Sequence, residues 1–182
     1  DKVVYIDESF NIRSYVYATD NRDGSVKVNV DKNVNFSVEG VTVITFSAKD
    51  RAGNVAQKSI TITVKKHPPF IPKVSTNNAA LDAYVDDLFT TLLHGDMSAY
   101  QITDALYRFG RTLRYQAGPL VSEWTSRALT ALKTRTGNCF GKMYAMEALY
   151  TRAGISNREQ IQYNQKHSWN QVNIGSGWLN AD

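Results

Sequence analysis

The sequence predicts an all-β sandwich over residues 1–66, followed by an α+β domain over residues 79–182 in which a helical bundle precedes an antiparallel sheet. Short runs rich in Val, Ile, Thr, Tyr and Phe fill the first part, and turn-forming residues separate them. Apolar residues at helical spacing begin after residue 78, and strand-like runs return near the C-terminus. Three prolines within residues 67–78 lie between the two patterns, so we expect a linker there, with His67 as a solvated member of it.

The first part contains four segments with the composition of strands. They are residues 12–18, 26–30, 41–48 and 59–64. Turn chemistry separates them, most clearly in Asp50-Arg51-Ala52-Gly53-Asn54. Short strands at this spacing are typical of a small β-sandwich.

Three aspartates lie in the predicted turns of this first part. Asp20, Asp23 and Asp50 have two interpretations: they build the turns, or their carboxylates gather around a calcium ion. The sequence shows no regular ladder of calcium ligands. No other metal site and no cofactor are predicted.

Three apolar stripes predict the helices of the second part. We expect all three stripes to form core, with the third helix beginning near Ser122. The charged groups Asp86-Asp87 and Arg108, Arg111 and Arg114 are expected to be solvated. The stripes are Leu81, Val85, Leu88, Phe89 and Leu92; Ile102, Leu106, Phe109 and Leu113; and Trp124, Ala128, Ala131 and Leu132.

Cys139 is the only cysteine in the 182 residues, so it cannot form an internal disulfide. Apolar residues follow it at helical spacing, and Gly154 is suited to end that helix. Gly137 allows a tight backbone approach just before it. Cys139 would then lie at a helix N-terminus, where backbone N–H groups and the helix dipole favour a thiolate.

A predicted hairpin provides the partners of such a thiolate. After a strand at residues 160–163, a run opens at His167 and a second closes at Asp182, joined by Gly175-Ser176-Gly177. The two outer ends of an antiparallel pair are adjacent, so Asp182 could orient the His167 ring while the ring faces Cys139. This arrangement is a Cys-His-Asp triad.

These residues resemble the transglutaminase-like core of the papain-like superfamily. The resemblance covers Leu106 to Asp182 and rests on Gly137-Asn138-Cys139, Arg152-Ala153-Gly154-Ile155, His167-Ser168-Trp169, and Trp178 four residues before Asp182. It implies Cys139 as nucleophile, His167 as general base and Asp182 as the orienting residue. It also implies Tyr115 and Trp169 at the oxyanion site and cleft.

The first part resembles the bacterial immunoglobulin-like repeats of cell-surface proteins. The similarity lies in Thr19-Asp20-Asn21 with Asp23-Gly24, and in Ala48 to Asn54 before a final strand. It implies a stalk or spacer domain and an extracellular or cell-surface location in a bacterium. We expect the second domain to be cut short at its C-terminus, because the family's sheet usually continues.

The charge distribution does not indicate a nucleic-acid partner. Residues 1–66 carry 10 basic and 8 acidic side chains, and residues 67–182 carry 11 and 9. No basic cluster stands out, and no stretch approaches the roughly 20 apolar residues that span a bilayer. The expected partners are a protein or peptide substrate and cell-wall or other surface components.

A triad of this kind predicts acyl transfer at an amide through a thioester, but leaves the acceptor open. A lysine amine would make the enzyme a transglutaminase, water would make it a deamidase, and a peptide-bond substrate would make it a protease. Two other hypotheses remain. One is a non-catalytic surface or adhesion module, and the other is an intermolecular disulfide through Cys139.

Overall fold

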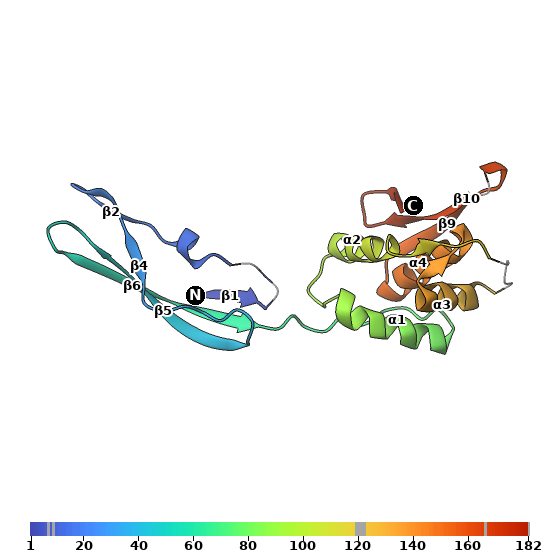
Figure 1. Cartoon of the computed structure of the whole chain (residues 1–182), viewed down its shortest axis with the longest axis horizontal. Coiled ribbons are helices and arrows are strands. Elements are labelled where there is room, and N and C mark those ends of the chain that lie inside the picture. The colour runs from blue at the N-terminus through green and yellow to red at the C-terminus, as the bar shows by residue number, and fades with distance from the viewer. Residues whose placement is uncertain (7, 9, 119–122, 166, 182) are drawn as a thin grey trace. The chain divides into compact units, whose positions relative to one another are not determined.

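A computed structural model describes the chain except residues 7, 9, 119–122, 166 and 182, and the chain divides into two compact units, Asp1–His67 and Pro68–Asp182 (Figure 1). Each unit has its own hydrophobic core. Among the described residues, no helix has the length and apolar character needed to cross a bilayer.

The first unit is built from strands around one four-stranded sheet in the order β1-β6-β5-β4. β1 is parallel to β6, and the other two pairings are antiparallel. A separate two-stranded ribbon joins β2 to β3 around the predicted Asp20–Gly24 turn. The elements are β1 (Lys2–Tyr5), η1 (Ile12–Tyr15), β2 (Ala18–Asp20), β3 (Gly24–Val26), β4 (Val28–Val30), β5 (Gly40–Lys49) and β6 (Val55–Lys65).

Two of the four predicted strands are confirmed and two need correction. Residues 41–48 lie in β5 and residues 59–64 lie in β6, but residues 26–30 are divided between β3 and β4. Residues 12–15 form a 3-10 helix because the Asn11 side chain accepts a hydrogen bond from the Arg13 N–H at 3.0 Å. The described strands form a sheet and a ribbon, and an immunoglobulin-like sandwich remains a prediction.

The second unit combines four described α-helices with a three-stranded antiparallel sheet in the order β11-β10-β9 (Figure 1). α4 packs against both α3 and β10, so the helix that begins at Cys139 lies between helices and sheet. The elements are α1 (Ala79–Leu92), α2 (Ala99–Gly110), β7 (Arg114–Tyr115), α3 (Trp124–Thr134), β8 (Thr136–Gly137), α4 (Cys139–Ala153), β9 (Ser156–Gln162), η2 (Tyr163–Gln165), β10 (His167–Asn173) and β11 (Trp178–Ala181).

The predicted stripes form the core of this unit. Of their members, Leu81, Leu106 and Leu132 are fully buried, and α4 buries one whole face against them. Gly154 ends α4 at φ 74°, as predicted. Ser122, the predicted start of the third helix, lies outside the described residues; α3 begins at Trp124, with the Glu123 side chain accepting hydrogen bonds from the first turn.

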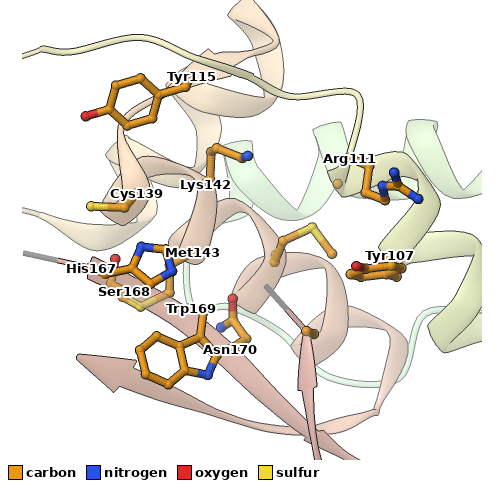
Figure 2. Close-up of a pocket in the computed structure, with 13 residues that line it drawn as sticks. Tyr107, Arg111, Tyr115, Cys139, Lys142, Met143, His167, Ser168, Trp169 and Asn170 are labelled. Carbon is orange, nitrogen blue, oxygen red and sulfur yellow. The ribbon is translucent and has the colours of Figure 1, made fainter. Parts of the chain in front are cut away.

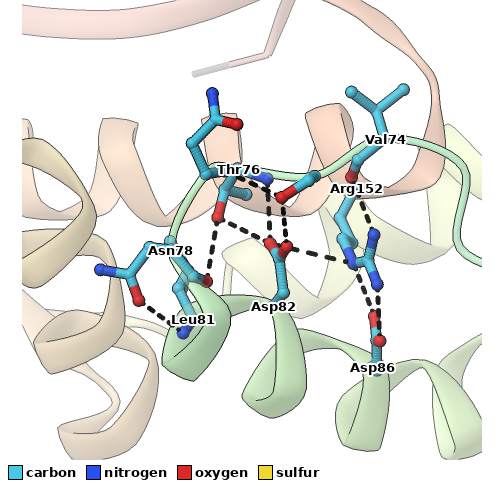
Figure 3. A network of polar contacts seen from close by, with 9 residues as sticks. Val74, Thr76, Asn78, Leu81, Asp82, Asp86 and Arg152 are labelled. Atoms are coloured by element: carbon cyan, nitrogen blue, oxygen red, sulfur yellow. Dashed lines mark hydrogen bonds and ion pairs between the residues drawn. The ribbon is translucent and has the colours of Figure 1, made fainter.

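An ion-pair network fixes the C-terminal end of α4 to α1. Arg152 donates two hydrogen bonds to the Asp86 carboxylate, both of 2.7 Å, and a third to the Val74 carbonyl at 3.1 Å (Figure 3). Asp82 accepts hydrogen bonds from Thr76 in the same network. Asp86 therefore links α1 to α4 through Arg152, and the expectation that its carboxylate is simply solvated was wrong.

Candidate active site

Cys139 is the first residue of α4, and local hydrogen bonds fix the backbone around it. The Asn138 side chain caps the helix by accepting from the Gly141 N–H at 2.9 Å. Arg127 donates to the same Asn138 oxygen at 3.3 Å, which holds the cap in place. The half-buried Cys139 side chain thus projects from a helix N-terminus, where the helix dipole favours negative charge.

A parallel strand pair places Tyr115 close to Cys139 in space. β7 pairs with β8 so that Tyr115 lies opposite Gly137, two residues before Cys139, and the Gln116 N–H donates to the Gly137 carbonyl at 3.0 Å. A Cβ at Gly137 would lie only 3.3 Å from the Lys142 backbone nitrogen. The close backbone approach predicted for this glycine is therefore present. Tyr115 itself is 70% exposed.

His167 opens β10, and the sheet fixes its position. It lies opposite Gln162 of β9, and its ring stacks on Trp169 with a centroid distance of 5.5 Å and an interplanar angle of 21°. The Trp169 indole N–H donates to Asn180 of β11 at 3.1 Å. The His167 imidazole therefore stacks on the Trp169 ring, which is held in turn by a hydrogen bond to β11.

These side chains share one pocket. Tyr115, Cys139, His167 and Trp169 all line it, and the His167 ring lies next to the Cys139 side chain (Figure 2). Its volume is about 160 Å³, whereas one water molecule needs roughly 10–15 Å³ of such space. The pocket can therefore admit a group the size of a side chain. Its other described lining residues are Tyr107, Gly110, Arg111, Lys142, Met143, Met146, Ser168, Asn170 and Ala181.

Comparison with protein families decides the affiliation of this unit. Residues 86–182, which are over half of the chain, match the family model of the transglutaminase-like superfamily. The chain belongs to this superfamily. The match includes Cys139, His167 and the whole pocket wall, so the transglutaminase-like fold of the second unit is established together with its family.

A solved structure from Cytophaga hutchinsonii, described provisionally as a cysteine protease, is similar to this chain at 12% sequence identity and a TM-score of 0.41. The alignment covers 91% of this chain and 68% of that one. A search for relatives among curated proteins gave no match.

The structure brings together four of the five predicted site residues of the transglutaminase-like domain. The fifth, Asp182, lies outside the described residues. The predicted hairpin is present, because β11 is antiparallel to β10. Its predicted register is not, because the described pairing ends at Ala181 opposite Asn170, three residues after His167. Ala181 also lines the pocket.

Sequence reasoning missed several pocket residues, of which Arg111, Lys142 and Asn170 matter most. Arg111 was expected to be solvated, but it lines the pocket from the C-terminal end of α2. Lys142 follows Cys139 by three residues, a spacing that shares a helix face and could have indicated it. Asn170 lies on the buried face of β10, and His167 lies on the opposite, half-buried face.

The calcium interpretation of the first unit receives no structural test, but the turn-building interpretation has direct support. Asp20 accepts from the Arg22 and Asp23 N–H groups at 2.8 and 2.9 Å. Asp23 accepts from the Arg51 N–H at 2.7 Å, and Asp50 accepts twice from Asn54. The hydrogen bonds from Asn54 lower the pKa of Asp50, and the one from the Asn54 side chain is the largest cause.

Proposed function

We propose that this protein performs cysteine-dependent acyl transfer or hydrolysis at an amide, either a glutamine side chain or a peptide bond, through a thioester on Cys139. The observation that carries the proposal is the shared pocket: a thiol at a helix N-terminus and an imidazole at a strand start line the same cavity (Figure 2). Membership of the transglutaminase-like superfamily supports the same chemistry.

In the first step, the Cys139 thiolate attacks the amide carbon and a C–S bond forms. His167 has accepted the thiol proton, and it gives this proton to the departing ammonia or amine as the C–N bond breaks. The backbone N–H of Cys139 and the Tyr115 hydroxyl donate hydrogen bonds to the oxyanion. The product of this step is a thioester on Cys139.

In the second step, an amine or water attacks the thioester carbon. His167 removes a proton from the attacking group, and the Cys139 sulfur leaves as a thiolate. An amine acceptor gives a new amide cross-link, whereas water gives a carboxylic acid. We assign Asp182 as the residue that orients His167, and Trp169 as the ring that limits rotation of the imidazole.

The proposal also covers the domain organisation and location of the protein. We infer that residues 1–66 are a bacterial immunoglobulin-like domain, joined through residues 67–78 to the catalytic domain, in a secreted or surface protein. The turns built by Asp20 and Asp50 and the strands beside them support this inference. Protein or peptide substrates, with cell-wall or other surface components, are the proposed partners.

The test is incubation of the protein with a glutamine-bearing peptide and a labelled primary amine. We expect the wild type to incorporate the amine or to release ammonia or new peptide termini, and Cys139→Ala and His167→Gln to lose the reaction. Arg108→Gln on the exposed side of α2 serves as the matched control. Absence of all three products from the folded wild-type protein would contradict the proposal and favour a non-catalytic surface module.

A further inference from the structure

We propose that the pocket selects acyl donors that carry a carboxylate, which binds between Arg111, Lys142 and Asn170. The inference rests on the proposed function for the identity of the ligand as an acyl donor. It adds the chemical class of that donor: an amide with a negatively charged group nearby.

The pocket wall carries two positive charges. Arg111 and Lys142 both line the pocket, and neither forms a salt bridge with any residue that the structure describes. The described lining residues include no Asp or Glu. Two positive charges on the wall of a small cavity create a potential that attracts an anion.

The pocket wall also contains a buried side-chain amide. Asn170 is 1% exposed and lines the pocket, yet neither its Oδ1 nor its Nδ2 has a hydrogen-bond partner among the described residues. Such a group is costly to bury unless something satisfies it. A carboxylate accepts hydrogen bonds, so one that enters the pocket would pair with the Asn170 amide N–H while the two cations on the pocket wall attract its charge.

The arrangement of the side chains separates this position from the reacting atoms. Cys139, His167 and Tyr115 lie on one side of the pocket, while Arg111 and Tyr107 lie on the other (Figure 2). The Lys142 ammonium group points away from Cys139 and toward the Arg111 side (Figure 2). A donor would therefore place its amide carbon at Cys139 and its carboxylate a short distance further along the same molecule.

Two sources can supply such a carboxylate: the free C-terminus of the donor peptide or the side chain of an acidic neighbour. Four peptides with one reactive glutamine distinguish them: glutamine at a free C-terminus, the same peptide amidated, an amidated peptide with Glu beside the glutamine, and its isosteric counterpart with Gln at that position. We expect kcat/KM to be at least about 10-fold higher for one charged member than for its neutral partner, a ratio typical of charge-assisted hydrogen bonds. The ratio should fall as salt is added.

Variants assign this preference to the proposed residues. Arg111→Gln and Lys142→Gln should each move the ratio of the two kcat/KM values toward one, whereas Arg108→Gln, on the same helix but away from the pocket, should leave it unchanged. Asn170→Leu distinguishes a binding role of Asn170 from a role in stability. It should raise the Tm, because an unpaired buried amide is removed, and weaken binding of the charged peptide.

Binding to the Cys139→Ala protein, measured by calorimetry with the same four peptides, keeps this inference separate from the catalytic proposal. A charged peptide that binds more tightly, with the difference lost in Arg111→Gln, supports the carboxylate site even if the wild type turns over no peptide. Equal kcat/KM and equal affinity for charged and neutral partners would overturn it. A preference that survives both cation variants would overturn it too.

Discussion

Glu147, on α4, ionises differently in the folded protein from an ordinary glutamate. Burial is the main cause, and the nearby carboxylate of Glu159 on β9 adds to it, so that the pKa of Glu147 rises from 4.5 to about 7. The folded state therefore holds this proton more tightly than the unfolded chain does. The stabilising contribution is complete below about pH 4.5 and is lost as the pH rises through about 7.

We predict that the free energy of unfolding falls as the pH rises from about 4.5 to about 7. The upper limit of the slope is about 1.4 kcal/mol per pH unit, and partial exposure of the side chain makes the slope smaller. Urea unfolding at a series of pH values measures it. Glu147→Gln should reduce the slope and stabilise the protein at pH 8, whereas Asp87→Asn on the exposed face of α1 should not. A slope unchanged by Glu147→Gln would show that the carboxyl pair does not cause it.

At the scale of elements, the Arg152 network joins α1 to α4 and so supports the helix that presents Cys139. Arg152 is 17% exposed, and its planar fork binds Asp86 through two hydrogen bonds (Figure 3). A lysine keeps the charge but cannot reproduce the fork. The bond to the Val74 carbonyl would also be lost or weakened.

We therefore predict that Arg152→Lys lowers the free energy of unfolding by about 1–2 kcal/mol. Arg108→Lys provides the control, because Arg108 pairs with Asp104 on the exposed surface of α2 and the change should stay within about 0.5 kcal/mol. Denaturant titration of both variants compares them directly. Similar losses in the two proteins would contradict a special role for the α1–α4 network.

The elements also show what could be predicted from the sequence. Local signals identified the helix that begins at Cys139, its end at Gly154 and the β10–β11 hairpin, because helical spacing, a left-handed glycine and a Gly-Ser-Gly turn act within a few residues. The 3-10 helix at Ile12–Tyr15 was missed because one Asn11 hydrogen bond outweighed strand-like composition.

Tertiary placement was harder to predict than local structure. Asp86 and Arg152 are 66 positions apart, and nothing in either local sequence shows that they pair. Arg111 has the same charge and helix as Arg108, yet one lines the pocket and the other pairs with Asp104. The position of such side chains depends on how the helices pack, and local sequence patterns do not determine that packing.

At the scale of the whole molecule, the two units have separate cores. Val4, Ile44 and Ile62 belong to the first, and Leu81, Leu106 and Leu149 belong to the second. All described residues of the pocket lie within the second unit, Pro68–Asp182. We predict that residues 68–182 fold without the first unit.

A fragment of residues 68–182 should unfold in one cooperative transition and retain a kcat/KM within about twofold of the full chain in the amine-incorporation assay. Circular dichroism and the assay together measure this. A fragment that is unfolded, or folded but inactive, would show that the second unit depends on the first.

The most direct test of the catalytic couple is the rate at which iodoacetamide labels Cys139 between pH 5 and pH 9. A peptide of residues 136–142 provides the reference for an unassisted thiol, whose rate falls about 10-fold per pH unit in acid because only the thiolate reacts. We predict that the protein keeps most of its rate at pH 6 and that His167→Gln loses this advantage. A wild-type rate that follows the peptide over the whole range would contradict the assignment of Cys139 and His167 as nucleophile and base.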